Sequence, residues 1–325
     1  MKTRVVLFIC ALIMALNAGL VFAEPEHTPA PLAQTQSSIL ESDGDLALVN
    51  RANRISKTYV PENLVQPKVS TRKESLQERI HMREHAARAL EAMFEAALLE
   101  EGYTLYATSG YRAYGIQQIL FNSKVEEVGS REKAQRRVAP PGSSEHQLGL
   151  AMDLQAPSHL NLSQAFGDTD EGKWAGENAH RFGYILRYKT AWRDITGVSD
   201  EPWHFRYVGI AHASAMHDLD IPLETYVEHA KALPEYVLRG ANHVLLAGLV
   251  KELMAGNHPP VLDDLRKAAP NEQAEALRLA TLPMLSSDQT YEDVLYYAYP
   301  TPKPTAAPWT DEDEEEVELL IGENL

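Results

Sequence analysis

The amino-acid sequence predicts an α+β fold, in which short strands and helices are mixed along the chain. Apolar residues recur at steps of three and four over 82–98 and over 237–253, as in amphipathic helices. Four short β-type segments lie between and beyond other helical segments, at 103–108, 150–154, 184–187 and 203–207. They do not alternate with helices in a regular βαβ rhythm, so the sequence does not predict a parallel doubly wound sheet.

The first 44 residues are expected to lie outside the ordered domain. Residues 1–23 combine a basic start, an apolar run and small residues before Glu24, which predicts a secretory signal. The same run is nearly long enough to remain as a membrane anchor. Either outcome exports the rest of the chain, to the periplasm, the cell wall or the extracellular space. Residues 24–44 are rich in Pro, Gln, Ser and Thr and predict a flexible leader.

The elements of the main domain, 45–231, follow in order. The helix over 82–98 ends at Gly102, and the first strand follows it directly. A further helix is predicted over 113–128. After it, the polar and basic loop 129–142 is expected to line a substrate groove. The last predicted helix of this domain, over 171–182, ends at Gly183 and leads into the final two strands.

The C-terminal part predicts a helical extension over 235–299. Gly248 interrupts the apolar pattern of its first helix. A second helical stretch over 261–280 is expected to break near Pro270. Residues 300–325 then form a tail that combines several prolines with an acidic block, and we expect it to be solvated.

Charge and cysteine content exclude several classes of protein. The chain has 325 residues, with 46 Asp and Glu against 30 Lys and Arg, and a net charge of −16. Such a surface disfavours nucleic acid and anionic lipid as partners. The sequence contains no glycine-rich phosphate loop, so no nucleotide is expected. The single cysteine, Cys10, lies in the predicted signal, which rules out a disulfide framework and a cysteine-based zinc site.

Two segments carry candidate metal-site chemistry. The first runs from Ser144 to Asp153 and contains His146, and the second is Glu201-Pro202-Trp203-His204. Two histidines and an aspartate, His146, Asp153 and His204, supply the nitrogen and oxygen ligands that a hydrolytic zinc ion takes while one position stays open for water. If Glu201 stays off the metal, it can act as a general base toward that water.

These motifs resemble the VanY-type zinc D-alanyl-D-alanine carboxypeptidases. The resemblance rests on the order of three motifs, Ser109-Gly110-Tyr111-Arg112, Ser-x-His-x-x-Gly-x-Ala-x-Asp at 144–153, and Glu201-Pro202-Trp203-His204, and it covers roughly 45–231. It implies the small antiparallel sheet with flanking helices shared with lysostaphin-type peptidases and hedgehog domains.

The resemblance also implies the roles of individual residues. One zinc ion per chain would be held by the three candidate ligands, with Glu201 as the catalytic base. Arg112 would face the substrate, where its planar fork suits a carboxylate or an oxyanion. Ser144 and Gln117 match positions that contact substrate. The implied reaction is hydrolysis of the terminal D-Ala-D-Ala bond of a peptidoglycan stem peptide.

Three alternatives stay open. The chain could be an L,D-carboxypeptidase that shortens the stem further, or an endopeptidase that cuts inside the stem or cross-bridge. It could also be a non-catalytic wall-binding or signalling module with a structural metal, although a structural site has no use for a base such as Glu201.

A penicillin-sensitive serine mechanism is not expected. Ser70-x-x-Lys73 and Ser130-x-x-Lys133 have its first spacing, but the sequence lacks the partner motifs.

Overall fold

The structure is a computed structural model of the chain. The structure describes residues 38–41, 44–73 and 79–295. The predicted signal, the leader up to residue 37 and the predicted tail lie outside the described residues. No helix in the described part of the chain has the length and apolar character needed to cross a membrane.

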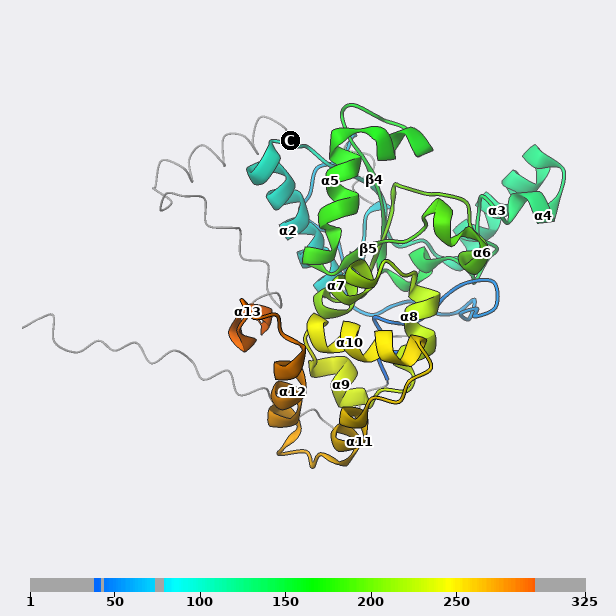
Figure 1. The fold of residues 1–325 in the computed structure, drawn as a ribbon. Helices are drawn as coiled ribbons and strands as arrows, with labels where there is room; N and C mark the ends of the chain where they lie inside the picture. Colours follow the sequence, from blue (N-terminus) through cyan, green and yellow to red (C-terminus); the bar gives the residue numbers. More distant parts are fainter. Residues whose placement is uncertain (1–37, 42–43, 74–78, 296–325) are drawn as a thin grey trace, which may run out of the picture. The chain divides into compact units, whose positions relative to one another are not determined.

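A four-stranded antiparallel sheet forms the centre of the first half (Figure 1). Its order is β3 (Tyr106–Ser109), β4 (Ala151–Gln155), β6 (His204–Tyr207) and β5 (Tyr184–Leu186). A separate two-stranded sheet pairs β1 (Leu64–Val65) with β2 (Met82–Arg83). The four predicted strands and the predicted α+β class are therefore confirmed.

One face of the main sheet packs on α2 (Glu84–Glu101) and the other is left for polar groups. Met152 and Leu154 of β4 and Phe205 of β6 belong to the apolar core that contains the buried side of α2. Side chains alternate between the two faces of a strand, so Asp153 and His204 point to the opposite face. The alternation thus separates the core from the candidate site.

The remaining elements of the first half are short except for α3. They are α3 (Tyr114–Val128), α4 (Arg131–Ala134), η2 (Glu145–Leu148), η3 (Gln164–Asp168), α5 (Asp170–Asn178), η4 (Ala179–Phe182), η5 (Thr190–Trp192) and α6 (Arg193–Thr196). The helix α4 was not predicted, because its four residues lie inside the polar stretch 129–142. The Ser130 side chain caps it by accepting a hydrogen bond from the Lys133 amide.

A second apolar core joins the C-terminal helices. They are α7 (Ile210–Leu219), α8 (Leu223–Ala230), α9 (Glu235–Gly240), α10 (His243–Met254), α11 (Pro260–Lys267), α12 (Gln273–Thr281) and η6 (Leu282–Met284). The last described helix, α13 (Tyr291–Leu295), contributes no residue to this core. This core contains residues from both sides of position 231, so it includes α7 and α8 as well as the predicted extension. Ile39 and Leu40 also pack against it, and Ser38 donates a hydrogen bond of 2.7 Å to Glu235.

Two helices replace the single helix expected over 237–253. The chain turns at Ala241, and the Asn242 side chain caps α10 by accepting a hydrogen bond of 3.0 Å from the Leu245 amide. Gly248 has a packing role inside α10, because a Cβ atom there would lie 2.6 Å from Met284 Sδ.

Candidate metal and active site

Strand register places two of the predicted ligands side by side. Strands β4 and β6 are antiparallel neighbours, and Asp153 pairs directly with His204. Side chains at directly opposed positions share one face of the sheet. The Nδ1 atom of His204 lies 3.0 Å from Asp153 Oδ1, and both side chains are buried.

His146 reaches the same place from η2, which precedes β4. Gly149 ends this turn with a φ of 69°, and a Cβ atom there would lie 2.9 Å from Leu64 Cδ2. Only glycine satisfies both the backbone angle and the close packing. The Nδ1 atom of His146 lies 2.8 Å from the Gly110 carbonyl oxygen, and its Nε2 atom lies 3.3 Å from Asp153 Oδ2.

The three side chains can together hold a metal ion. Within the described residues they form a group in which one ligand atom from each lies within 4.8 Å of the others. Two imidazole nitrogens and one carboxylate oxygen match the ligand set of a catalytic zinc ion that keeps a position open. The second nitrogen of each histidine faces an acceptor, the Gly110 carbonyl for His146 and Glu145 for His204. Such outer contacts orient histidine ligands in metal sites.

Glu201 lines the same cavity as the three candidate ligands. Burial raises the pKa of Glu201 to about 7, against the opposing attraction of His204. Its carboxylate makes no hydrogen bond within the described part of the chain. A carboxylate with a pKa near neutrality, close to a metal site and without a protein partner, has the properties of a general base.

Arg112 lies beside the candidate ligand Asp153. Its guanidinium donates hydrogen bonds of 2.8 Å to Gln117 and 2.8 Å to Ser109, and lies 3.7 Å from Asp153. The buried Gln117 amide also donates to the Ala139 carbonyl at 2.7 Å, so both ends of this side chain are engaged with protein. Its contacts therefore position Arg112. Ser144 is buried and lines the cavity directly before η2.

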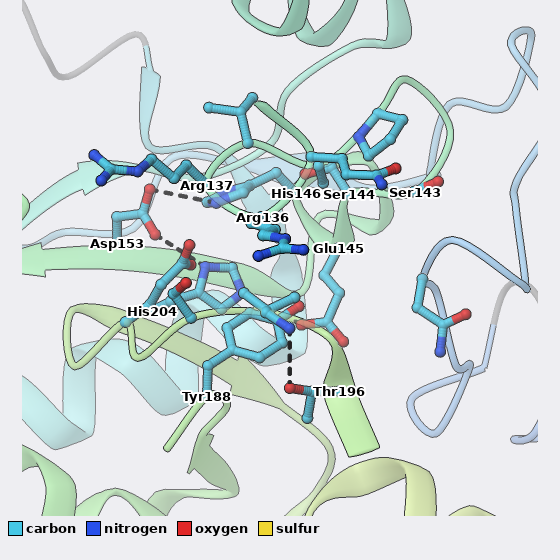
Figure 2. Close-up of a pocket in the computed structure, with 18 of the residues that line it drawn as sticks. Arg136, Arg137, Ser143, Ser144, Glu145, His146, Asp153, Tyr188, Thr196 and His204 are labelled. Atoms are coloured by element: carbon cyan, nitrogen blue, oxygen red, sulfur yellow. Dashed lines mark hydrogen bonds and ion pairs between the residues drawn. The ribbon is translucent and has the colours of Figure 1, made fainter. Parts of the chain in front are cut away.

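A cavity of about 580 Å³ opens onto these residues (Figure 2). Gln135, Arg136, Arg137 and Ala139 line it, so part of the 129–142 segment borders this cavity, and its role in a substrate groove stays a prediction. We call this part of the cavity lining the wall. It contains two arginines, although the whole chain is acidic.

Sequence reasoning missed the surroundings of His204. Its Nε2 atom lies 3.3 Å from the buried carboxylate of Glu145, and its ring centroid lies 5.2 Å from that of Tyr188, with the two rings tilted by 30°. Burial lowers the pKa of His204, but hydrogen bonds to Asp153 and Glu145 outweigh burial and raise the pKa to about 9. The position of Glu145 beside a motif histidine was the available signal, although its fully buried partners are far away in the sequence.

Comparisons with known proteins agree with this geometry. Residues 79–210 match the family model described as "VanY: D-alanyl-D-alanine carboxypeptidase". The putative carboxypeptidase YodJ of Bacillus subtilis (strain 168) is 44% identical over 197 residues, which span 60% of this chain and 71% of YodJ. The chain belongs to the VanY family.

Two further comparisons agree with this result. The D-alanyl-D-alanine carboxypeptidase of Enterococcus faecalis (strain ATCC 700802 / V583) is 36% identical over 220 residues, spanning 65% of this chain and 75% of that one. The solved structure of the LdcB LD-carboxypeptidase superposes with a TM-score of 0.55 at 45% identity, covering 57% of this chain and 86% of that chain. VanY-type relatives are thus carboxypeptidases, and the candidate site lies inside the matched region.

Proposed function

We propose that this chain is a zinc carboxypeptidase that hydrolyses the terminal D-Ala-D-Ala bond of peptidoglycan stem peptides. The observation that carries the proposal is the buried group of His146, Asp153 and His204, which opens onto a cavity beside Glu201. Membership of the VanY family, with a D-alanyl-D-alanine carboxypeptidase among its relatives, supports the substrate class.

Zinc would be held by His146, Asp153 and His204, and when bound it would supply a Lewis acid that polarises the scissile carbonyl and acidifies water. Glu201 accepts the proton of the attacking water and transfers it to the nitrogen of the departing alanine. Arg112, fixed by Gln117 and Ser109, offers its guanidinium to the terminal carboxylate or to the developing oxyanion. No covalent enzyme intermediate is needed.

Several basic side chains line the cavity, which five acidic residues also line, and we infer that the basic ones favour an acidic peptide. Arg136 and Arg137 line the cavity together with Arg51 and Lys124. Stem peptides carry carboxylates in addition to the terminal one, and a positively charged wall raises their local concentration even on an acidic protein. We therefore assign the wall to binding the part of the stem that precedes the scissile bond.

One observation favours a second activity at the same site. The solved LdcB structure, 45% identical to this chain, is that of an LD-carboxypeptidase. Removal of alanine from a tetrapeptide stem by the same residues is therefore the second candidate function. We infer that the chain acts outside the cytoplasm, because residues 1–23 have the pattern of a secretory signal.

Purified protein incubated with synthetic stem peptides tests the proposal. Mass spectrometry of the products is expected to show loss of one alanine from a pentapeptide ending in D-Ala-D-Ala. Loss of alanine from the tetrapeptide alone would replace the D,D activity by the L,D activity. Cleavage at an internal bond would identify an endopeptidase, and intact peptides throughout, with zinc bound, would contradict a peptidase function.

A further inference from the structure

A cluster of buried charges lies beside the candidate metal site, and the proposed reaction does not use it. The side chains of Glu145, Arg187 and Arg206 are fully buried, and that of Glu224 is 13% exposed. The negative charges of two carboxylates equal the positive charges of two guanidinium groups in this cluster. Buried charges are costly to desolvate, so their retention in a core needs an explanation beyond stability.

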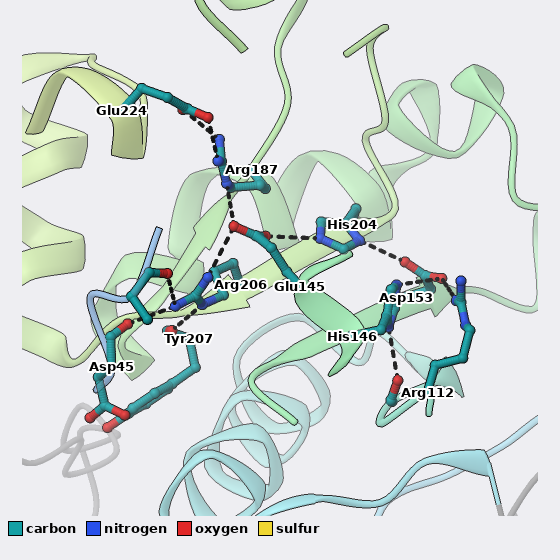
Figure 3. A network of polar contacts seen from close by, with 12 residues as sticks. Asp45, Arg112, Glu145, His146, Asp153, Arg187, His204, Arg206, Tyr207 and Glu224 are labelled. Carbon is teal, nitrogen blue, oxygen red and sulfur yellow. Dashed lines mark hydrogen bonds and ion pairs between the residues drawn. The ribbon is translucent and has the colours of Figure 1, made fainter. Parts of the chain in front are cut away.

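Glu145 connects this cluster to the candidate ligand His204 (Figure 3). One of its oxygens, Oε1, accepts hydrogen bonds from Arg187 Nε at 2.8 Å and from Arg206 Nη1 at 3.0 Å. The other oxygen, Oε2, lies 3.3 Å from His204 Nε2. Metal binding displaces the Nδ1 proton of His204, and a carboxylate at this position keeps the remaining proton on Nε2, so that the Nδ1 lone pair is directed toward Asp153 and the metal position.

Both arginines are in turn held by distant parts of the chain. Arg187 forms a two-pronged pair with Glu224 of α8, at 2.7 and 2.9 Å. Arg206 donates to the carbonyl oxygens of Asp45 and Ala47 at 2.9 and 3.0 Å. Because α8 belongs to the second core, these contacts connect the C-terminal helices to a candidate metal ligand through three side chains.

Glu145 has the contacts of an ionised carboxylate in this setting. Its Oε1 atom lies 2.8 Å from Arg187 Nε and 3.0 Å from Arg206 Nη1, so two guanidinium groups face one carboxylate. An ionised carboxylate is a stronger acceptor for an imidazole N–H than a neutral group. Replacing it by an amide would leave the cluster with one excess positive charge beside a cation site.

We propose that Glu145 is a positioning residue that orients His204 for metal binding, and that Glu224 supports it from α8 through Arg187. The inference rests on the proposed function only in taking zinc as the metal. The C-terminal helices then contribute to the metal site, because Glu224 of α8 contacts Arg187, which in turn contacts Glu145.

The test compares zinc dissociation constants, measured by competition with a chromophoric chelator. Glu145→Gln keeps the size of the side chain and removes its charge, and we expect zinc binding to weaken by about 10–100-fold. Glu224→Gln should weaken it in the same direction by a smaller factor. Glu100→Gln is the matched control, because it removes a partly buried ion pair with Arg181 (2.7 Å) outside the cavity. Its zinc affinity should equal that of the unchanged protein.

Circular dichroism and unfolding temperature decide between positioning and a merely structural role. A folded Glu145→Gln protein with unchanged zinc affinity overturns the proposal. If Glu145→Gln does not fold, Glu224→Gln decides, and unchanged zinc affinity in that variant overturns it. Failure of the proposed function is a separate result, because an unchanged protein that binds zinc but leaves stem peptides intact still allows the affinity comparison.

Discussion

At the scale of single residues, substitution of Glu201 distinguishes a catalytic role from a role in metal binding. Glu201→Gln keeps the shape of the side chain but cannot accept a proton, and general-base catalysis contributes about 10²–10⁴-fold to a rate. We expect alanine release to slow by at least about 10²-fold while zinc content stays at one per chain. Rate assays and elemental analysis of the same sample measure both quantities.

The matched control for this variant is Glu177→Gln, which changes an exposed glutamate on α5. It should keep both the rate and the zinc content. Two results would contradict the assignment. Loss of zinc from Glu201→Gln would make Glu201 a ligand, and full activity would place the base on another residue.

The sequence predicted those site residues that stand in short motifs of metal-binding residue types. The residues His146, Asp153 and His204 stand out as metal-type side chains, and the structure brings them together. The role of Glu145 could not be predicted in this way. Its partners Arg187 and Arg206 are 42 and 61 residues away in the chain, and a charged residue beside a turn ordinarily faces solvent. Only the fold brings these charges together inside the core.

At the scale of elements, prediction succeeded where a helix has one apolar face. The amphipathic pattern over 82–98 corresponds to α2, whose buried residues lie on one side. The helix α7 was missed for the opposite reason. Five consecutive residues, His212 to Met216, are buried there, so the helix has no polar face that would produce a periodic pattern. It packs against α10, η4 and the strand β5.

His212 connects three of these helices and makes their packing sensitive to pH. Its Nδ1 atom lies 2.7 Å from the Tyr226 hydroxyl of α8, and its Nε2 atom lies 2.8 Å from the Leu238 carbonyl of α9. Burial lowers the pKa of His212 to about 4, against weaker opposing effects that include the charges of Asp45 and Glu235. The unfolded chain therefore takes up this proton near pH 6.5, well before the folded chain does.

The stability contributed by a neutral His212 is thus complete above about pH 6.5 and is lost as the pH falls toward 4. We expect His212→Phe to lower the free energy of unfolding by about 1–3 kcal/mol at pH 7.5. The deficit in the free energy of unfolding of His212→Phe, relative to the unchanged protein, should be smaller at pH 5. It should decrease by about 1.4 kcal/mol for each pH unit below 6.5.

Urea unfolding at the two pH values measures this difference. The matched control is Tyr226→Phe, which loses one of the same hydrogen bonds but keeps the titrating imidazole. Its deficit should remain nearly constant between pH 7.5 and 5. A deficit of His212→Phe that does not change with pH would show that His212 does not titrate in this range.

At the scale of the whole molecule, zinc should govern both activity and stability. A metal that binds only the folded chain raises the free energy of unfolding by an amount that depends on its concentration relative to the dissociation constant. We expect a strong chelator to abolish alanine release and to lower the unfolding temperature. Added zinc should restore both together, since a single site between β4, β6 and η2 accounts for them.

Penicillin provides the complementary measurement, because it acylates nucleophilic serines. Ser70 and Ser130 have the spacing of such a nucleophile relative to Lys73 and Lys133, but neither serine lines the cavity, and Ser130 donates a hydrogen bond of 2.6 Å to Glu132. We therefore expect activity to be unchanged by penicillin at concentrations that inactivate a serine D,D-carboxypeptidase assayed in parallel. Inhibition by penicillin together with resistance to the chelator would require a serine nucleophile and would overturn the zinc mechanism for the whole chain.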